Sequence, residues 1–386
     1  MQQVKAEIVV IGGGAIGTSI ACHLAEGGVD VTLVERDQIG SGSTSKAAGG
    51  LRTIFSDRLN IEMAAKSIEK LENFSNNPGF EIDFKRSGYL ILISNNSDLE
   101  NFQKISSLQN EYGIPSRIVS SEEAREINPL ISLDGILGAL YSPTDAQCSP
   151  EGVAMGYAKG AKRAGARIFL GQSIQSIETK NNHIERVITQ DYSIKTKAVV
   201  ISAGVWSPMI GEMVGLNIPV LPYKREIIIT ETLGDKWKNI SKELPMTIDF
   251  SSTLSWRPEG ESLLIGFSDH TVNAGFNTNR DSQYIEKLAE LAVNRIPIMA
   301  EIGIGKGWAG LYDNSPDNNC ILGEVHVPQR LLYATGFSGH GIMQAPAVGE
   351  IIRDLYLRKE SFVDISSFSL ERFENSRRNI GEKAVF

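Results

Sequence analysis

The sequence has few cysteines and no long apolar run. Cys22, Cys148 and Cys320 are its only three, and no two stand in a C-x-x-C spacing, which excludes a disulfide framework and indicates no metal site. Apolar runs reach only about five residues, where a membrane-spanning helix needs roughly 20. The N-terminus has neither the apolar core nor the cleavage site of a signal peptide, so we expect a soluble, cytoplasmic protein without a transmembrane segment.

Basic residues are outnumbered by acidic ones. The chain has 38 Lys and Arg against 46 Asp and Glu, a formal net charge of −8. Because nucleic-acid-binding proteins carry a basic stripe, we expect no nucleic-acid partner. The chain is 41% hydrophobic over 386 residues, enough for a sizeable core and more than one domain. No linker or run of like charges divides it, so its domains must be interleaved.

The first 35 residues predict a strand, a helix and a second strand. Residues 7–11 form a short, β-branched run typical of a buried parallel strand. Helical spacing follows over residues 15–26 and stops at a pair of glycines. Residues 31–35 form the second strand.

The turn between the first strand and the helix carries a G-x-G-x-x-G fingerprint at Gly12, Gly14 and Gly17. Its position, with Glu35 at the end of the second strand, is that of a dinucleotide site. Gly12 permits the tight turn, Gly14 lets the backbone approach a pyrophosphate, and Gly17 lets the helix pack on the strand. Glu35 would accept hydrogen bonds from ribose hydroxyls.

Two further segments favour a flavin over a nicotinamide. In the loop over residues 41–52, the hydroxyls of Ser43 and Thr44 can bind phosphate oxygens, and the small residues 48–50 leave room for a flat ring. Residues 333–344 predict a strand, a glycine-rich turn and a helix start, whose positive end would stabilise a reduced flavin.

The rest of the chain alternates between strand and helix patterns without a repeat. We expect helices over 61–74, 99–112, 122–127, 150–165, 282–295 and 342–358, strands over 88–94, near 168, and over 174–177, 184–189, 198–202 and 331–334, and a β-rich stretch over 219–267.

Four motifs in order carry a family resemblance: the fingerprint, Val199–Ser207, Gly307–Tyr312 followed by Ser315-Pro-Asp317, and Gly336–Gly341. With them, nearly the whole chain resembles the D-amino-acid-oxidase-like superfamily of FAD-dependent oxidoreductases, especially sarcosine oxidase and L-proline dehydrogenase β-subunits and glycine oxidase.

The resemblance implies an α/β fold, with a Rossmann-like FAD-binding domain interleaved with a mixed α+β substrate domain. We expect the FAD-binding domain to take residues 1–85, 145–220 and 318–386. The substrate domain would take residues 86–144 and 221–317.

The resemblance also implies which residues contact FAD, from its ADP half through the adenine to the isoalloxazine. They are Gly12, Gly14, Ala15, Ile16, Gly17, Glu35, Arg36, Ser43, Thr44, Ala48, Gly49, Gly50, Leu51, Ile174, Ala203, Gly204, Trp206, Gly310, Gly339, His340, Gly341, Ile342 and Met343. Relatives that tether their flavin use a Cys where this chain has Gly310, or a His where it has Ser45 or Lys46. We therefore expect non-covalent FAD and no metal.

The implied chemistry is hydride transfer from the carbon next to an amine to flavin N5, followed by hydrolysis of the imine. Sarcosine, proline, glycine and D-amino acids are the expected substrates. Arg52 matches a carboxylate-binding arginine of sarcosine oxidases, although a structural arginine is the alternative. Tyr312 stands where glycine oxidase has a second arginine. His340 would orient backbone N–H groups of its turn, with a satisfied core histidine as an equal alternative.

Other pocket candidates are Tyr223, Trp256, Arg257 and His270, for which sheet packing or a surface position is an equal alternative. Leu264 and Met343 stand where sarcosine oxidases have a lysine that promotes reaction with oxygen. Because a desolvated cation there stabilises superoxide formation, we expect a dehydrogenase or a slow oxidase.

Two other functions fit the same motif order. One is an FAD-dependent 2-hydroxyacid or glycerol-3-phosphate oxidoreductase. The other is an electron-relay subunit of a larger complex. A second subunit or a homo-oligomer is open in each case.

Overall fold

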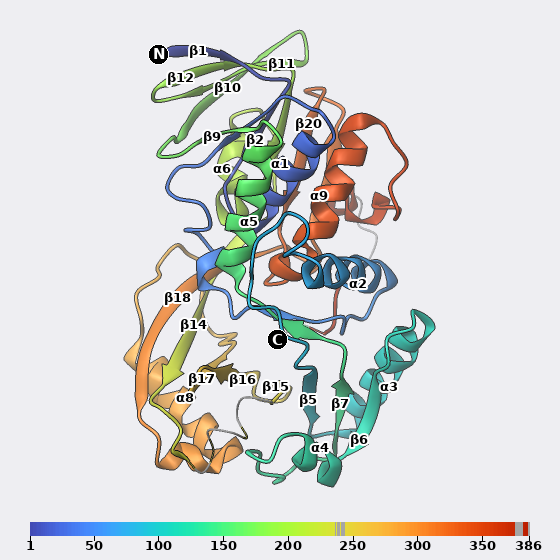
Figure 1. Cartoon of the computed structure of the whole chain (residues 1–386), viewed down its shortest axis with the longest axis vertical. Helices are drawn as coiled ribbons and strands as arrows, with labels where there is room; N and C mark the ends of the chain where they lie inside the picture. Colours follow the sequence, from blue (N-terminus) through green and yellow to red (C-terminus); the bar gives the residue numbers. More distant parts are fainter. Residues whose placement is uncertain (236, 238–239, 241–243, 375–380, 385–386) are drawn as a thin grey trace.

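The computed structural model describes residues 1–235, 237, 240, 244–374 and 381–384. Figure 1 shows a group of sheets and helices at the top and a large sheet at the bottom, and the chain passes between them several times. The fold is α/β with a Rossmann-like domain, as predicted from the sequence. Within the described ranges, none of the helices has the length and apolar character needed to cross a membrane.

A six-stranded sheet forms the centre of the upper part. Its order is β19 (Ile321–Val325), β20 (Leu331–Thr335), β13 (Ala198–Ile201), β2 (Ile8–Ile11), β3 (Val31–Val34) and β9 (Arg167–Phe169). All neighbours are parallel except β19 and β20. Continuous apolar residues suit strands that are covered on both faces.

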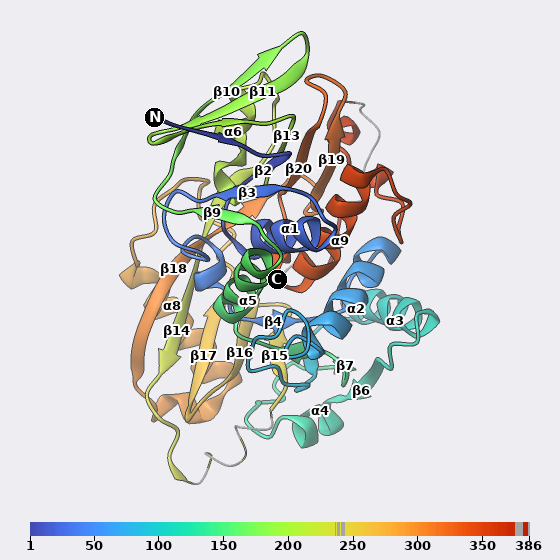
Figure 2. The same cartoon turned by 45° about the horizontal axis from the view of Figure 1, so that its top comes forward.

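Helices cover one face of this sheet and a second sheet covers the other. On the first face α1 (Ala15–Glu26) packs between α9 (Gly341–Leu357) and α5 (Pro150–Arg163), and α2 (Arg58–Glu72) packs on α9. On the second face lies a four-stranded sheet of β1 (Gln2–Lys5), β12 (Tyr192–Lys195), β11 (His183–Thr189) and β10 (Ile174–Lys180). Figure 2 shows both layers.

The lower part is one eight-stranded sheet. Its order is β18 (Ile304–Asn314), β14 (Leu221–Thr230), β17 (Ser262–Phe267), β16 (Leu254–Glu259), β15 (Met246–Asp249), β5 (Tyr89–Ile93), β7 (Gly138–Ser142) and β6 (Arg117–Ser120). One face packs in an apolar cluster that includes α8 (Ser282–Arg295) and α4 (Ser121–Ile127). The other face turns toward the upper part.

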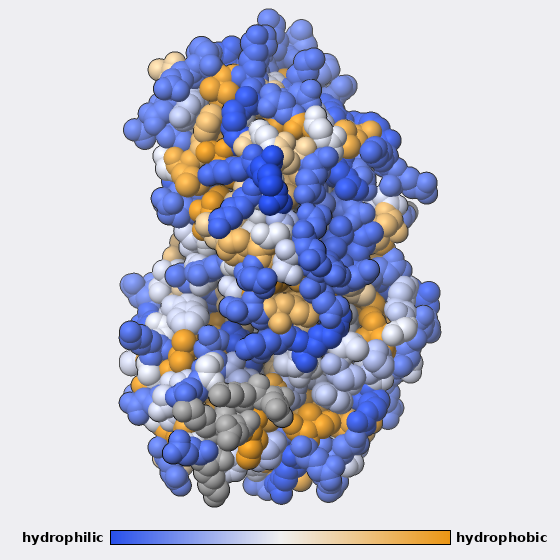
Figure 3. Space-filling view, in the orientation of Figure 1, coloured by the Kyte–Doolittle hydropathy of each residue, from blue (hydrophilic) through white to orange (hydrophobic). Residues whose placement is uncertain are grey.

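Smaller elements complete the fold. A two-stranded sheet pairs β4 (Gly50–Leu51) with β8 (Ala146–Gln147), α3 (Asn96–Glu111) follows β5, and α6 (Ser207–Glu212) follows β13. Figure 3 shows mainly hydrophilic residues on the face seen in Figure 1, with hydrophobic residues in small groups.

Most predicted elements are confirmed, with shifted ends. The helices expected to start at residues 61 and 99 start at Arg58 and Asn96. In both, a capping side chain sets the start: Asp57 accepts a hydrogen bond from Asn60 N, and Asn95 accepts one from Asp98 N. Both predictions were three residues late because they began at an apolar residue, Ile61 or Leu99, and not at the residue after the cap.

Several strands were missed, and β18 is the most informative. Its glycines hide the strand pattern, yet they are what lets it lie close to β14: a Cβ at Gly305 or Gly307 would approach Ile229 O or Ile227 O to 2.7 and 2.6 Å. The eight strands of the lower sheet lie inside the ranges 86–144 and 221–317. The domain boundaries stay a prediction, and residues 375–380, 385 and 386 of the range 318–386 lie outside the described residues.

An ion pair at the end of α8 fixes the lower sheet to its covering helix. Arg295 Nε lies 2.9 Å from Asp249 Oδ2 of β15, and its Nη1 donates to Ser132 O and Asp134 O. Both side chains are largely buried.

We expect Arg295→Met to lower the free energy of unfolding by about 3 kcal/mol, because it leaves the Asp249 carboxylate buried without its cation. Urea denaturation measures the change. Arg125→Ala, on the exposed side of α4, is the control and should change stability by less than about 0.5 kcal/mol. Equal losses in both variants would contradict this role for Arg295.

Candidate active site

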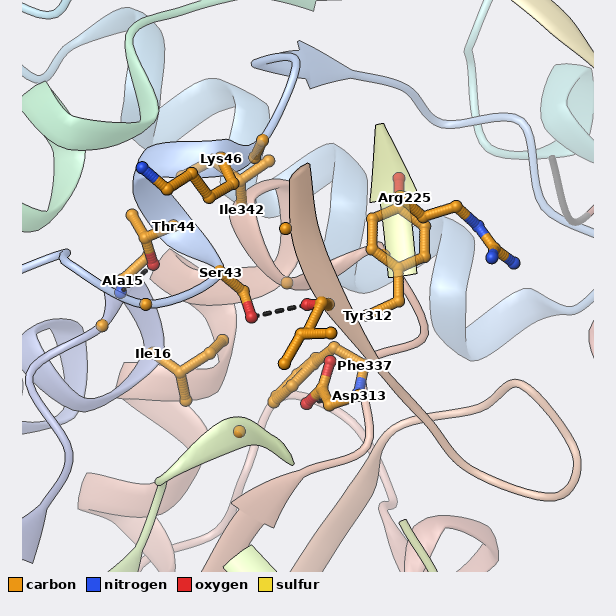
Figure 4. Close-up of a pocket in the computed structure, with 18 of the residues that line it drawn as sticks. Ala15, Ile16, Ser43, Thr44, Lys46, Arg225, Tyr312, Asp313, Phe337 and Ile342 are labelled. Atoms are coloured by element: carbon orange, nitrogen blue, oxygen red, sulfur yellow. Dashed lines mark hydrogen bonds between the residues drawn. The ribbon is translucent and has the colours of Figure 1, made fainter. Parts of the chain in front are cut away.

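A cavity of about 440 Å³ lies between the upper and lower parts. It runs from the glycine turn after β2, past the loop 41–52 and the turn before α9, to the upper face of the eight-stranded sheet. Figure 4 shows part of its lining. All but two of the predicted cofactor residues line it, the exceptions being Gly17 and Leu51.

Gly17 and Leu51 pack inside the protein instead. A Cβ at Gly17 would lie 1.9 Å from Gly12 O, so the glycine is what lets α1 sit against the turn. Gly12 itself has a φ of 111°, and a Cβ there would lie 2.4 Å from Ser202 O of the β13 end. Leu51 is fully buried in the apolar core.

The glycine turn forms one end of the cavity. The N-terminus of α1 opens into it at Gly14, Ala15 and Ile16, and Ala15 N donates to Thr44 Oγ1 at 3.1 Å (Figure 4). The free N–H groups of a first helical turn attract phosphate. Nearby, the Glu35 carboxylate accepts from Gly13 N at 2.6 Å and from Asp37 N at 2.7 Å, which holds it at the cavity wall where a ribose acceptor is needed.

The adenine side of the cavity contains further predicted residues. The Arg36 guanidinium lies 4.3 Å from the centre of the Trp206 ring, and both residues line the cavity. Ile174, Ala203 and Gly204 also line it. Gln172 and Ser173 were missed, because they lie in an irregular segment before β10 that carries no motif.

The loop 41–52 is bound to the lower sheet by three hydrogen bonds. Ser43 Oγ donates to Leu311 O at 2.6 Å, Trp308 Nε1 donates to Lys46 O at 3.1 Å, and Arg257 Nε donates to Ala48 O at 2.7 Å (Figure 4 draws the first). Arg257 therefore supports the loop from below and does not line the cavity.

Gly49 and Gly50 line the cavity, but protein packing is what requires them. A Cβ at Gly49 would lie 2.2 Å from Cys148 O, and one at Gly50 would lie 1.7 Å from Tyr89 Oη. Gly310, across the cavity, would bring a Cβ within 2.5 Å of Lys46 Cβ. No side chain can therefore be added at Gly310 without moving the loop.

The turn before α9 is held by a buried carboxylate. Asp313 Oδ2 accepts from Gly336 N at 2.9 Å and from Phe337 N at 3.2 Å. Burial raises the pKa of Asp313 to about 6, and the backbone donors oppose that rise.

A Cβ at Gly339 would lie 2.3 Å from the Tyr312 ring, so the turn packs directly on β18. Gly341, Ile342 and Met343 then point the start of α9 into the cavity.

Arg52 and His340 form a buried pair at the cavity wall. Arg52 donates to Ile54 O, to Ala384 O at 2.7 Å and to His340 Nε2 at 2.9 Å. Burial, and then the Arg52 charge, lowers the pKa of His340 well below its ordinary value. Because arginine can only donate, Nε2 accepts and Nδ1 of the neutral ring carries the proton. These partners favour the structural alternative for Arg52, and its catalytic role stays a prediction.

Arg225 is a cavity residue that sequence reasoning missed. It lies on β14 directly opposite Gly310, with its guanidinium 5.3 Å from the centre of the Tyr312 ring (Figure 4). Nη1 donates to Lys224 O, while the buried Nε has no hydrogen-bond partner among the described residues. Burial lowers its pKa, but an arginine stays charged in proteins. Strand alternation, with an exact register for β14, was the signal that could have found it.

The upper face of the large sheet forms the floor of the cavity. One row across the strands holds Tyr89, Met246 and Leu264, and the next holds Ile227, Gly266, Ser255 and Ile248. Trp256 is fully buried on the opposite face, His270 is exposed after β17, and Tyr223 lies outside the lining. Sequence reasoning therefore named many residues that line the upper end of the cavity and few of those on its floor.

The residues present fit an extended dinucleotide with a flat ring. The turn at Gly12 and Gly14, the Glu35 acceptor and the two helix N-termini lie along one cavity, and the small residues 48–50 lie near its floor. In the part of the chain that the structure describes, no cluster of three metal-ligating side chains occurs.

A protein-family model described as FAD dependent oxidoreductase (DAO) matches residues 7–355. The chain belongs to this family. It is therefore an FAD-dependent oxidoreductase, and the resemblance seen in its motifs is confirmed. Non-covalent attachment stays a prediction, which the lack of space for a side chain at Gly310 supports.

Proteins similar to this chain include enzymes named for amino acids. It is 29% identical to glycine oxidase of Bacillus licheniformis, over 96% of this chain and 99% of that one. It is 28% identical to mitochondrial dimethylglycine dehydrogenase of Mus musculus over 96% of its own length, but spans only 44% of that protein. The crystal structure of L-proline dehydrogenase from P. horikoshii is 31% identical, with a TM-score of 0.91, covering 97% of this chain and 99% of that one.

We expect Gly17→Ala to weaken FAD binding at least about tenfold, because the added Cβ pushes α1 away from the glycine turn. Fluorescence titration of the apoprotein with FAD measures the dissociation constant. Gly234→Ala is the matched control, since its Cβ meets no atom within 4 Å. Unchanged FAD affinity in Gly17→Ala would show that the close approach of α1 is not needed.

Proposed function

We propose that this enzyme oxidises the carbon–nitrogen bond of a small amino acid or N-methylated amino acid. The observation that carries the proposal is Arg225, a cation on the cavity floor with a buried Nε that bonds no described residue. The names of the similar proteins, glycine oxidase, dimethylglycine dehydrogenase and L-proline dehydrogenase, support the substrate class. When bound, FAD supplies the acceptor for the hydride that leaves the substrate carbon.

Arg225 is suited to bind the substrate carboxylate. A guanidinium offers a fork of N–H donors that matches a carboxylate, and such charge-assisted bonds strengthen away from water. No carboxylate of the described residues forms an ion pair with it; Asp269 acts on it only at longer range. Tyr312, whose ring flanks the guanidinium, places a hydroxyl on the same side of the cavity (Figure 4). Our proposal therefore gives carboxylate binding to Arg225, while the same role for Arg52 stays a prediction.

The remaining floor suits an uncharged amine. Gly266 and Ser255 leave space above the sheet, and Ile227, Ile248 and Leu264 surround them. Two carboxylates that line the cavity near this region are engaged elsewhere: Glu226 lies 2.7 Å from Lys224 Nζ, and Asp313 binds the turn before α9. A neutral amine is the form whose lone pair can assist loss of a hydride from the neighbouring carbon.

The floor also bears on the electron acceptor. Leu264 and Met343 both line the cavity and are apolar. They stand at the two positions compared with the oxygen-activating lysine of sarcosine oxidases. Lys46 lines it as well, and Figure 4 shows its ammonium directed away from Arg225 and Tyr312. We therefore favour a dehydrogenase or a slow oxidase.

The test is an anaerobic titration of the FAD-loaded protein with sarcosine, L-proline, glycine and D-alanine, with L-lactate and glycerol 3-phosphate as controls. We expect one of the amines to bleach the flavin absorbance, and readmitted air to reoxidise it slowly. Reduction by a control alone would replace the amine with a hydroxyl substrate. A flavin that none of them reduces would indicate a relay subunit, and rapid stoichiometric peroxide would overturn the dehydrogenase assignment.

We expect Arg225→Met to raise KM for the reducing amine by roughly 100-fold, since it removes charge-assisted hydrogen bonds to the carboxylate. Arg225→Lys should give a KM between those of the wild type and Arg225→Met, because lysine keeps the charge but lacks the forked pair of N–H donors. Steady-state kinetics at saturating FAD gives the values. Arg280→Met removes an exposed arginine outside the cavity lining and should leave KM unchanged. A normal KM in Arg225→Met would mean that the carboxylate binds elsewhere.

A further inference from the structure

Two residues of the segment 381–384 are buried close to residues that line the cavity. Glu382 and Ala384 are 4% and 1% exposed, and Glu382 N donates to Asp317 O at 3.0 Å. Ala384 packs in the apolar cluster that contains Ile54, Tyr89 and Met246. Two of those neighbours, Tyr89 and Met246, also line the cavity.

Hydrogen bonds fasten this segment to the chain that follows Arg52. The Glu382 carboxylate accepts from Ser56 N at 2.9 and 3.1 Å and from Ala384 N at 2.7 Å. Lys383 N donates to Ser56 Oγ at 3.0 Å. The segment therefore follows residues 54–56 closely and cannot shift without breaking these bonds.

The same segment supplies Arg52 with an acceptor and with negative charge. The Ala384 carbonyl accepts from Arg52 Nη2, and the Glu382 carboxylate raises the pKa of Arg52 against the lowering effect of burial. Asp145 acts in the same direction from the other side, while its own carboxylate binds Thr53. A buried cation needs such compensation to remain in place.

Arg52 in turn positions His340. Its Nη2 meets His340 Nε2 at 2.9 Å, and its guanidinium lies 4.5 Å from the centre of the Phe55 ring. That ring meets the imidazole edge to face at 5.1 Å. His340 directly precedes α9, whose first turn lines the cavity.

We propose that residues 381–384 are a positioning segment for the FAD site: the Glu382 carboxylate fixes the segment, and its Ala384 carbonyl holds Arg52 against His340 and so fixes the start of α9. None of residues 381–384 lines the cavity itself. The proposal depends on FAD binding and not on the amine substrate, so the two can fail separately.

The test compares Glu382→Gln, Arg52→Met and the double variant. The readouts are the FAD dissociation constant and the hydrogen exchange of residues 336–347 in the apoprotein. We expect Glu382→Gln to weaken FAD binding roughly tenfold and to speed exchange in this segment. In the Arg52→Met background, Glu382→Gln should change the FAD dissociation constant and the exchange rate little further, because the connection to His340 is already broken.

Lys383→Met is the control, since its side chain is exposed. If Glu382→Gln does not fold, Glu382→Asp, which keeps the charge on a shorter side chain, replaces it and should show the same effects at smaller size. Faster exchange at residues 54–57 with no change over 336–347 would overturn the proposal, as would full additivity of the two substitutions. A segment that packs on residues 54–56 without positioning Arg52 and His340 would give either of these results.

Discussion

The site depends on how closely α1 approaches the end of β2. Only glycine at positions 12 and 17 lets the helix backbone touch the turn, and this contact aims the free N–H groups of the first helical turn into the cavity. Glu35 reinforces the arrangement from the next strand by binding the turn at Gly13. The start of α9 enters the same cavity from β20. Two helix N-termini and one carboxylate thus define where a dinucleotide can lie, before any residue of the substrate floor is considered.

Two arginines show how differently a buried cation can be used in one cavity. Arg52 is satisfied by the protein itself, through two carbonyls and a neutral imidazole, and it therefore organises the structure around it. Arg225 is desolvated on the floor with a donor that the described residues leave unused. The first cation has its hydrogen bonds without a ligand, whereas under the proposed function the second gains its strongest bonds from a carboxylate that enters the cavity.

The fold and the cofactor side were predictable because their signals are local. Three signals lie within the first 35 residues: the β-branched strand, the glycine turn that follows it, and Glu35 at the end of the next strand. Each residue type there has a physical reason in a dinucleotide site. The floor was not predictable, because it depends on the register of eight strands. Trp256 and Ser255 are neighbours in sequence, yet one is buried beneath the sheet and the other faces the cavity. Arg225 was missed for the same reason, and the bond that most favours the structural alternative for Arg52 comes from Ala384, which is distant in sequence.

The three hydrogen bonds from the loop 41–52 to the lower sheet constrain how the enzyme can move. Ser43, Trp308 and Arg257 join the cofactor loop to β18 and β16, so separating the two halves of the molecule would break all three bonds. A hinge motion that opens the cavity between the two halves would therefore cost at least these three bonds. We therefore expect a ligand to enter and leave by displacement of surface segments around the cavity rather than by a hinge between the halves.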